Sequence, residues 1–206
     1  MGIWVTGDTH GDFHRFTTKN FPHLKGMSRD DCMIIAGDFG GVWAGEQVDG
    51  HKLDWLEDKP FTTLFVDGNH ENFSLLNSYP EREWHGGRVH AVRPHVLHLM
   101  RGQVYDIQDR KFFTMGGASS HDIQDGILEA DDSLLKKKCR ELDAKGAMYR
   151  INHLSWWKEE LPSETEYQTA RASLDRAGWE VDYIITHCCP TSVQDELRAA
   201  FTKPMP

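Results

Sequence analysis

One local pattern recurs along this chain and constrains its fold more than any other: a short apolar run that ends in polar side chains able to bind a metal. The predicted strand 3–6 leads into Gly7-Asp8-Thr9-His10-Gly11. Three more apolar runs end in the same way: 31–36 before Gly37-Asp38, 61–66 before Gly68-Asn69-His70-Glu71, and 181–186 before His187. Because ligands gather at the carboxyl ends of strands in open α/β sheets, these runs predict an α/β fold with one site at a sheet edge.

The first motif suggests the kind of site. Asp8 and His10 are two positions apart, so their side chains point the same way if strand geometry continues through them. A carboxylate and an imidazole that converge on one point suit a divalent transition metal. Taken alone, the motif has an alternative interpretation, a turn in which Asp8 caps the next helix.

Taken together, the four motifs resemble those of the calcineurin-like metallophosphoesterase family. The resemblance runs from the first strand to near the C-terminus, and segments 116–122 and 155–160 are similar to the small bacterial and phage-type branch. It implies a four-layer α/β/β/α sandwich of two mixed sheets, formed by a single domain over residues 1–206.

The same resemblance implies a dinuclear centre with two divalent ions (Mn, Fe or Zn) and phosphoester hydrolysis by a metal-bridging hydroxide. Asp38 is expected to bridge the ions. Asp8 and His10 would complete the ligands of the first ion, and Asn69 and His187 those of the second.

Three further residues are expected to act on the substrate. By resemblance, His70 contacts the phosphate and protonates or stabilises the leaving oxygen, a role suited to an imidazole that titrates near neutral pH. Arg150 and His121 are the candidates for substrate binding, since a guanidinium pairs well with phosphate.

The sequence departs from the family pattern in two places. Gly41 stands where the family often has an aspartate, three residues after the bridging one, and no Gly-His-x-His motif occurs. The chain therefore resembles a family member without its C-terminal part, in which each metal would have one histidine fewer. We expect weak activity from such a chain, and self-association through an uncovered sheet edge.

Composition narrows the possible partners. With 23 basic and 32 acidic residues the net charge is −9, which argues against general binding of nucleic acid or an anionic membrane. A phosphorylated small molecule or a phosphoprotein stays possible, because bound cations would invert the local field. The four cysteines match no zinc motif and favour a reducing, cytoplasmic setting. No apolar run is long enough to span a membrane.

The leading interpretation is therefore a metal-dependent phosphoesterase. A non-catalytic scaffold with the same fold is the alternative, and the acidic net charge disfavours a nuclease. Between the motifs, we expect helices over 13–19, 52–57, 72–77, 131–146 and 162–177, a loop over 43–50, and antiparallel strands from residue 88 that begin a second sheet.

Overall fold

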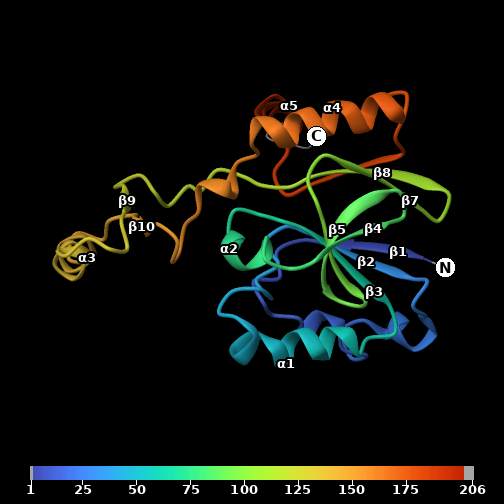
Figure 1. Ribbon diagram of the computed structural model, residues 1–206, viewed down its shortest axis with the longest axis horizontal. Coiled ribbons are helices and arrows are strands. Elements are labelled where there is room, and N and C mark those ends of the chain that lie inside the picture. Colours follow the sequence, from blue (N-terminus) through green and yellow to red (C-terminus); the bar gives the residue numbers. More distant parts are fainter. Residues whose placement is uncertain (1, 202–206) are drawn as a thin grey trace.

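Two β-sheets lie face to face between helices in the computed structural model, which describes residues 2–201 (Figure 1). The larger sheet has the strand order β1-β2-β3-β6-β5-β4, with bounds Ile3–Thr6, Cys32–Ala36, Thr62–Val66, Val96–Leu99, Gly87–Arg93 and Glu81–Trp84. The smaller sheet has the order β11-β8-β7, with bounds Tyr183–Thr186, Arg110–Met115 and Gln103–Ile107. Helix α1 (Glu46–Glu57) lies outside the larger sheet and α4 (Glu164–Arg176) outside the smaller one. This is the predicted four-layer α/β/β/α sandwich of two mixed sheets.

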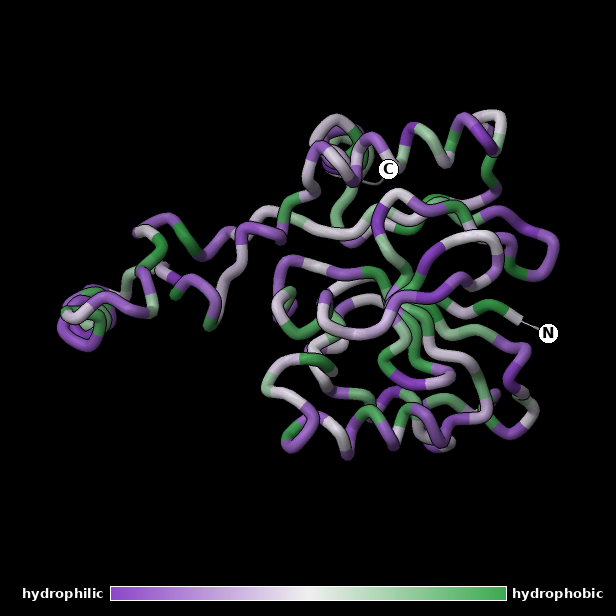
Figure 2. Tube along the Cα trace, viewed as in Figure 1, coloured by the Kyte–Doolittle hydropathy of each residue, from purple (hydrophilic) through white to green (hydrophobic). Residues whose placement is uncertain are grey.

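Each interface between layers has its own hydrophobic core. Between α1 and the larger sheet lie buried side chains that include Phe16, Leu53, Leu56, Phe61 and Phe65. Between the two sheets lie Ile34, Leu64, Leu97, Tyr105, Phe112 and others. Figure 2 shows hydrophobic residues gathered on the strands at the centre of the body. Alternate residues of β2 and β3 thus serve opposite cores, which explains why both strands read as continuous apolar runs.

The pairing of the strands places the motifs together. Strands β1, β2 and β3 are mutually parallel, with Val5 opposite Ile34 and Ile34 opposite Leu64. Strand β11 is parallel to β8 in the second sheet. The loops that follow β1, β2 and β3 therefore leave the larger sheet at one edge, as expected for a ligand site in an α/β fold.

The second sheet begins later in the chain than predicted. Strand β6 pairs in parallel with β3, and β5 pairs antiparallel with β6, so both extend the larger sheet. All four residues of β6 are buried. A strand that is buried on both faces lies in the interior of a sandwich. The prediction relied on the short spacing between the strands, and this spacing does not show which sheet a strand joins.

Two predictions for the segments beside the first core were also wrong. The segment 13–19 holds only a 3₁₀ helix, His14–Phe16, because the Asn20 side chain donates to the His14 carbonyl (2.9 Å) and competes with helix formation. Conversely, 46–50 is helical rather than looped. Helix α1 includes Gly50, and Oδ2 of Asp49 accepts backbone N–H groups from Trp43, Ala44 and Gly45 at 2.6–2.9 Å.

The remaining helices and strands are α2 (Phe73–Leu76), α3 (Leu135–Asp143), α5 (Thr191–Phe201) and the parallel pair β9 (Ile127–Leu128) and β10 (Arg150–Ile151). Two more 3₁₀ helices span Pro22–Gly26 and Lys158–Glu160. The pair β9–β10 and α3 form an arm that projects from the body (Figure 1). None of the helices within residues 2–201 combines the length and the apolar character needed to cross a membrane.

Candidate metal centre

The loops after β1 and β2 are joined by backbone hydrogen bonds. The N–H groups of Thr9 and His10 donate to the Asp38 carbonyl (3.1 and 2.8 Å), and Gly11 N donates to Phe39 O (2.9 Å). This pairing holds the side chains of the first motif against those of the second.

Three of the expected metal ligands have left-handed backbone conformations. The φ angles are +38° at Asp8, +45° at His10 and +48° at Asp38. Strand β1 ends at Thr6, so Asp8 and His10 lie in a strained turn after the strand. The strand alternation that the sequence suggested for these two residues does not extend to them. Such conformations cost about 1–3 kcal/mol each and cluster at functional sites, where the surrounding structure enforces them.

Two motif glycines allow a close approach that no other residue permits. A Cβ at Gly68 would lie 2.0 Å from Asp38 Oδ1, and one at Gly37 would lie 2.1 Å from His187 Nδ1. The side chains of Asp38 and His187 therefore pack directly against these backbones, which explains why the strand ends carry glycine.

Asp38 lies at the centre of the cluster. Its carboxylate oxygens are 3.6 Å from His10 Nε2, 3.2 Å from His70 Nδ1 and 3.6 Å from His187 Nε2. His187 Nδ1 also lies 3.7 Å from Asp8 Oδ1. The ligand atoms of His10, Asp38 and His70 all lie within 4.8 Å of one another, a spacing that a bound metal ion requires.

The charges in the cluster support an ionised Asp38. Burial raises the pKa of this carboxyl, but hydrogen bonds from the His70 side chain and backbone, with the charges of His187 and His70, lower the pKa below its ordinary value. In return, the hydrogen bond to Asp38 raises the pKa of His70. A buried carboxylate, 4% exposed and facing three imidazoles, is suited to binding cations.

Glu71 is a buried residue beside the cluster to which the sequence assigned no role. It is 1% exposed and accepts hydrogen bonds from Phe39 N (2.7 Å), Gly68 N (3.4 Å) and Gly40 N (3.5 Å). Burial raises its pKa to about 8. Glu71 therefore links the loops after β2 and β3. The signal available in the sequence was its place at the end of the motif Gly68-Asn69-His70-Glu71.

The remaining predicted site residues, Asn69, Arg150 and His121, differ in their surroundings. Asn69 donates from Nδ2 to Ser120 Oγ (3.2 Å), and no hydrogen bond to its Oδ1 occurs within residues 2–201. Arg150 lies beside His70, with Nη2 3.4 Å from Nε2. His121 is exposed, and within residues 2–201 no hydrogen bond or ion pair joins it to the cluster.

Sequence reasoning missed Asp122. Its Oδ2 accepts from Arg150 Nε (2.9 Å) and lies 3.9 Å from His70 Nε2. The hydrogen bond from Arg150 lowers the pKa of Asp122. Asp122 therefore brings a carboxylate to the side of the His70 ring that faces away from Asp38.

The donor set fits divalent metal ions. Imidazole nitrogens together with carboxylate and amide oxygens suit Mn, Fe or Zn, and the strained backbones and close glycine contacts hold these donors in place. The group that the structure brings within reach of one ion is His10, Asp38 and His70. The ligand set Asp8, His10, Asp38, Asn69 and His187, which leaves out His70, stays a prediction.

Comparison with known proteins gives one match. The family model for calcineurin-like phosphoesterases matches residues 1–200, a range that contains every residue of the cluster. No curated protein and no solved structure matches significantly.

Proposed function

This chain belongs to the calcineurin-like phosphoesterase family, and on that basis we propose that it hydrolyses phosphomonoesters or phosphodiesters with two divalent metal ions held around Asp38. The observation that carries the proposal is the ionised, buried Asp38 surrounded by three imidazoles at the carboxyl edge of the larger sheet. When bound, such ions polarise the phosphate and lower the pKa of water to about 7.

His70 and Arg150 act on the substrate side of this centre. A phosphate oxygen paired with the Arg150 guanidinium would lie next to His70 Nε2, because these groups are 3.4 Å apart. The raised pKa of His70 increases its protonated fraction at neutral pH, as a proton donor to the leaving oxygen requires. Asp122 orients Arg150 through the hydrogen bond to its Nε.

The enzyme is favoured over a non-catalytic scaffold by the strain at the three ligand positions. A scaffold gains nothing from left-handed conformations at Asp8, His10 and Asp38, which cost about 1–3 kcal/mol each. The net charge of −9 disfavours a nuclease. A small phosphorylated molecule or a phosphoprotein is the proposed substrate class.

The test pairs elemental analysis of the manganese-loaded protein with three substrates: an aryl phosphate, a bis-aryl phosphodiester and a phosphopeptide. We expect metal-dependent hydrolysis of at least one, abolished in Asp38→Ala. Asp12→Asn is the matched control, since Asp12 lies in the same loop but is exposed and pairs with His14 (2.7 Å). Bound metal without hydrolysis of any of the three substrates would indicate a scaffold.

A further inference from the structure

We propose that Ser120 and Glu160 are positioning residues that fix the Asn69 carboxamide with its oxygen, and not its nitrogen, towards the metal centre. This inference rests on the proposed function, because it concerns the same centre. It assigns a role to two buried polar residues that lie far from the four motifs in sequence.

The three side chains form a hydrogen-bonded chain. Asn69 Nδ2 lies 3.2 Å from Ser120 Oγ, which lies 2.5 Å from Glu160 Oε2. The other oxygen, Glu160 Oε1, accepts the Ser120 backbone N–H at 3.0 Å. Ser120 is 7% exposed and Glu160 only 2%, so protein groups must supply their partners.

The Glu160 carboxylate fixes which groups donate and which accept in this series of hydrogen bonds. A carboxylate can only accept hydrogen bonds, so the Ser120 hydroxyl must donate its one hydrogen to Glu160. The lone pairs of Ser120 Oγ are then left to accept, and only the NH₂ end of the Asn69 amide can donate to them. The amide oxygen consequently points away from Ser120, and only this oxygen can bind a cation.

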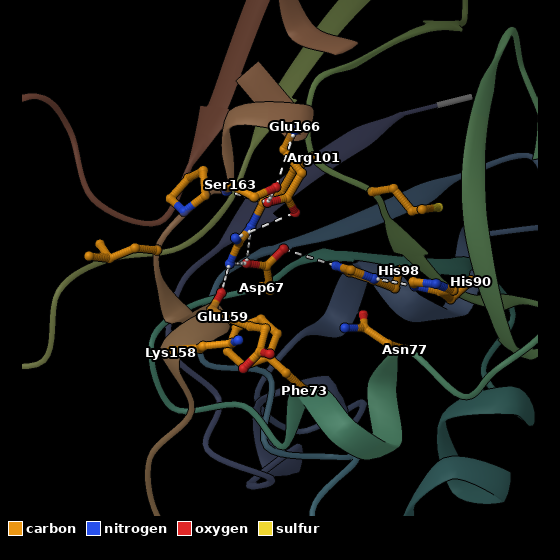
Figure 3. A pocket seen from close by; sticks show the side chains of 13 residues that line it. Asp67, Phe73, Asn77, His90, His98, Arg101, Lys158, Glu159, Ser163 and Glu166 are labelled. Atoms are coloured by element: carbon orange, nitrogen blue, oxygen red, sulfur yellow. Dashed lines mark hydrogen bonds and ion pairs between the residues drawn. The ribbon is translucent and has the colours of Figure 1, made fainter. Parts of the chain in front are cut away.

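Glu160 is itself anchored to the segment after β3, which contains Asn69. Arg101 donates to the Glu159 carbonyl (2.8 Å), and its Nε donates to Asp67 Oδ2 (2.8 Å) (Figure 3). The same guanidinium also donates to the Glu160 carbonyl (3.4 Å). Asp67 directly follows β3, two residues before Asn69.

Gly117 completes this fit. It has φ +88°, and a Cβ there would lie 2.4 Å from the Glu160 carbonyl oxygen. The segment that carries Ser120 is thus held against the 3₁₀ turn Lys158–Glu160, called here the Glu160 turn. Both ends of the series of hydrogen bonds are therefore fixed relative to β3.

The substitution Glu160→Gln should reverse the direction of these hydrogen bonds while it keeps the shape of the side chain. The Ser120 backbone N–H requires an acceptor, so the introduced amide places its oxygen there and its NH₂ beside Ser120 Oγ. The hydroxyl hydrogen then turns to Asn69, which accepts it only by presenting its oxygen to Ser120 and its NH₂ to the metal centre.

The experiment is manganese titration of the full chain by calorimetry, with the metal-free melting temperature as a check of folding. We expect Ser120→Ala and Glu160→Gln to weaken manganese binding about 10–100-fold, the range seen when partners of metal ligands are lost. Ser119→Ala and Glu159→Gln are matched controls with wild-type affinity, because neither side chain takes part in the chain of hydrogen bonds.

A second variant, Asn69→Asp, distinguishes a positioning role of Glu160 from a general loss of stability. In Asn69→Asp the introduced carboxylate can accept from Ser120 with one oxygen and face the metal with the other. Adding Glu160→Gln to this variant should therefore strengthen manganese binding, the opposite of its effect on the wild type. Loss of affinity in both backgrounds, or wild-type affinity in Glu160→Gln, would overturn the inference. A wild-type chain that binds no manganese would instead overturn the proposed function.

Discussion

At the scale of single residues, Asp38 holds the site together. It is the only carboxylate in the described chain that contacts His10, His70 and His187 together, and its own carbonyl accepts the N–H groups of the neighbouring loop. His70 contacts the same carboxylate but also reaches Arg150 and Asp122 on the other side. The two residues therefore have separable roles.

Replacing these two residues should give unequal losses. We expect Asp38→Asn to reduce turnover more than His70→Ala, because Asp38 would serve both metal ions, while general acid catalysis is worth about 10²–10⁴-fold. Manganese content by elemental analysis and kcat on an aryl phosphate measure the difference. Comparable metal content together with greater residual turnover in the Asp38 variant would contradict the assignment.

At the scale of elements, the base of the arm completes the site. Arg150 lies on β10, and Asp122 lies in the segment that leads from β8 to β9, so the arm supplies the groups around His70 Nε2. Helix α3 at the end of the arm has no buried residue, and Leu134 before it is 55% exposed. The arm thus contributes to the site through its base.

Arg150→Ala should reduce kcat/KM about 10–100-fold, since hydrogen bonds to charged groups contribute about 1.5–3 kcal/mol. Arg150→Lys should recover part of this loss, because it keeps the charge but not the two-pronged geometry. Steady-state kinetics on an aryl phosphate provide the measurement. Arg171→Ala is the control, since Arg171 is an exposed residue of α4 that pairs with Glu164 (3.2 Å). Wild-type kcat/KM in Arg150→Ala would remove Arg150 from the substrate site.

At the scale of the whole molecule, a buried polar network lies beneath the Glu160 turn and lines a cavity of about 480 Å³ (Figure 3). Burial raises the pKa of Asp67, but Arg101 and His98 lower it to about 2. The ionised Asp67 accepts from His98 Nε2 (3.0 Å), and Nδ1 of His98 lies 2.9 Å from Nδ1 of His90. The His90 imidazole is thus buried against His98 within this network.

The protein should lose stability in mild acid through His90. Burial and the neighbouring His98 lower the pKa of His90 to about 4, while an unfolded chain has the ordinary value of about 6.5. The folded state thus binds this proton more weakly. His90 leaves stability unchanged above pH 6.5 and lowers it progressively between pH 6.5 and 4, by up to about 3 kcal/mol.

Urea unfolding across this pH range tests the point. The decline in the free energy of unfolding should be shallower in His90→Asn, whose amide can still form a hydrogen bond with His98. His153→Asn, at an exposed position, should retain the wild-type slope. Equal slopes in His90→Asn and the wild type would show that His90 does not titrate as described.

Both sheets also have an edge strand with exposed apolar side chains. Val5 of β1 is 56% exposed, and Tyr183 and Ile184 of β11 are 51% and 64% exposed. Such edges invite pairing with another chain, so the self-association expected from the sequence remains a prediction for this part of the molecule.

The sequence by itself determined the buried strands, the chemistry of their ends and the family. These follow from local properties: apolar runs, glycines where side chains approach the backbone, and ligand types in a fixed order. The positions of Asp8, His10, Asp38 and His187 could be read in this way, and the structure brings their side chains together.

Only the tertiary structure decided which side chains support these residues. Asp122 meets His70, Ser120 meets Asn69 and Glu160 meets Ser120 across 52, 51 and 40 positions of sequence, respectively. The placement of β5 and β6 in the larger sheet, and the left-handed turn that brings Asp8 towards His187, were decided in the same way. Such contacts depend on which strands pair and which loops pack together, and a local pattern of residue types carries no information about either.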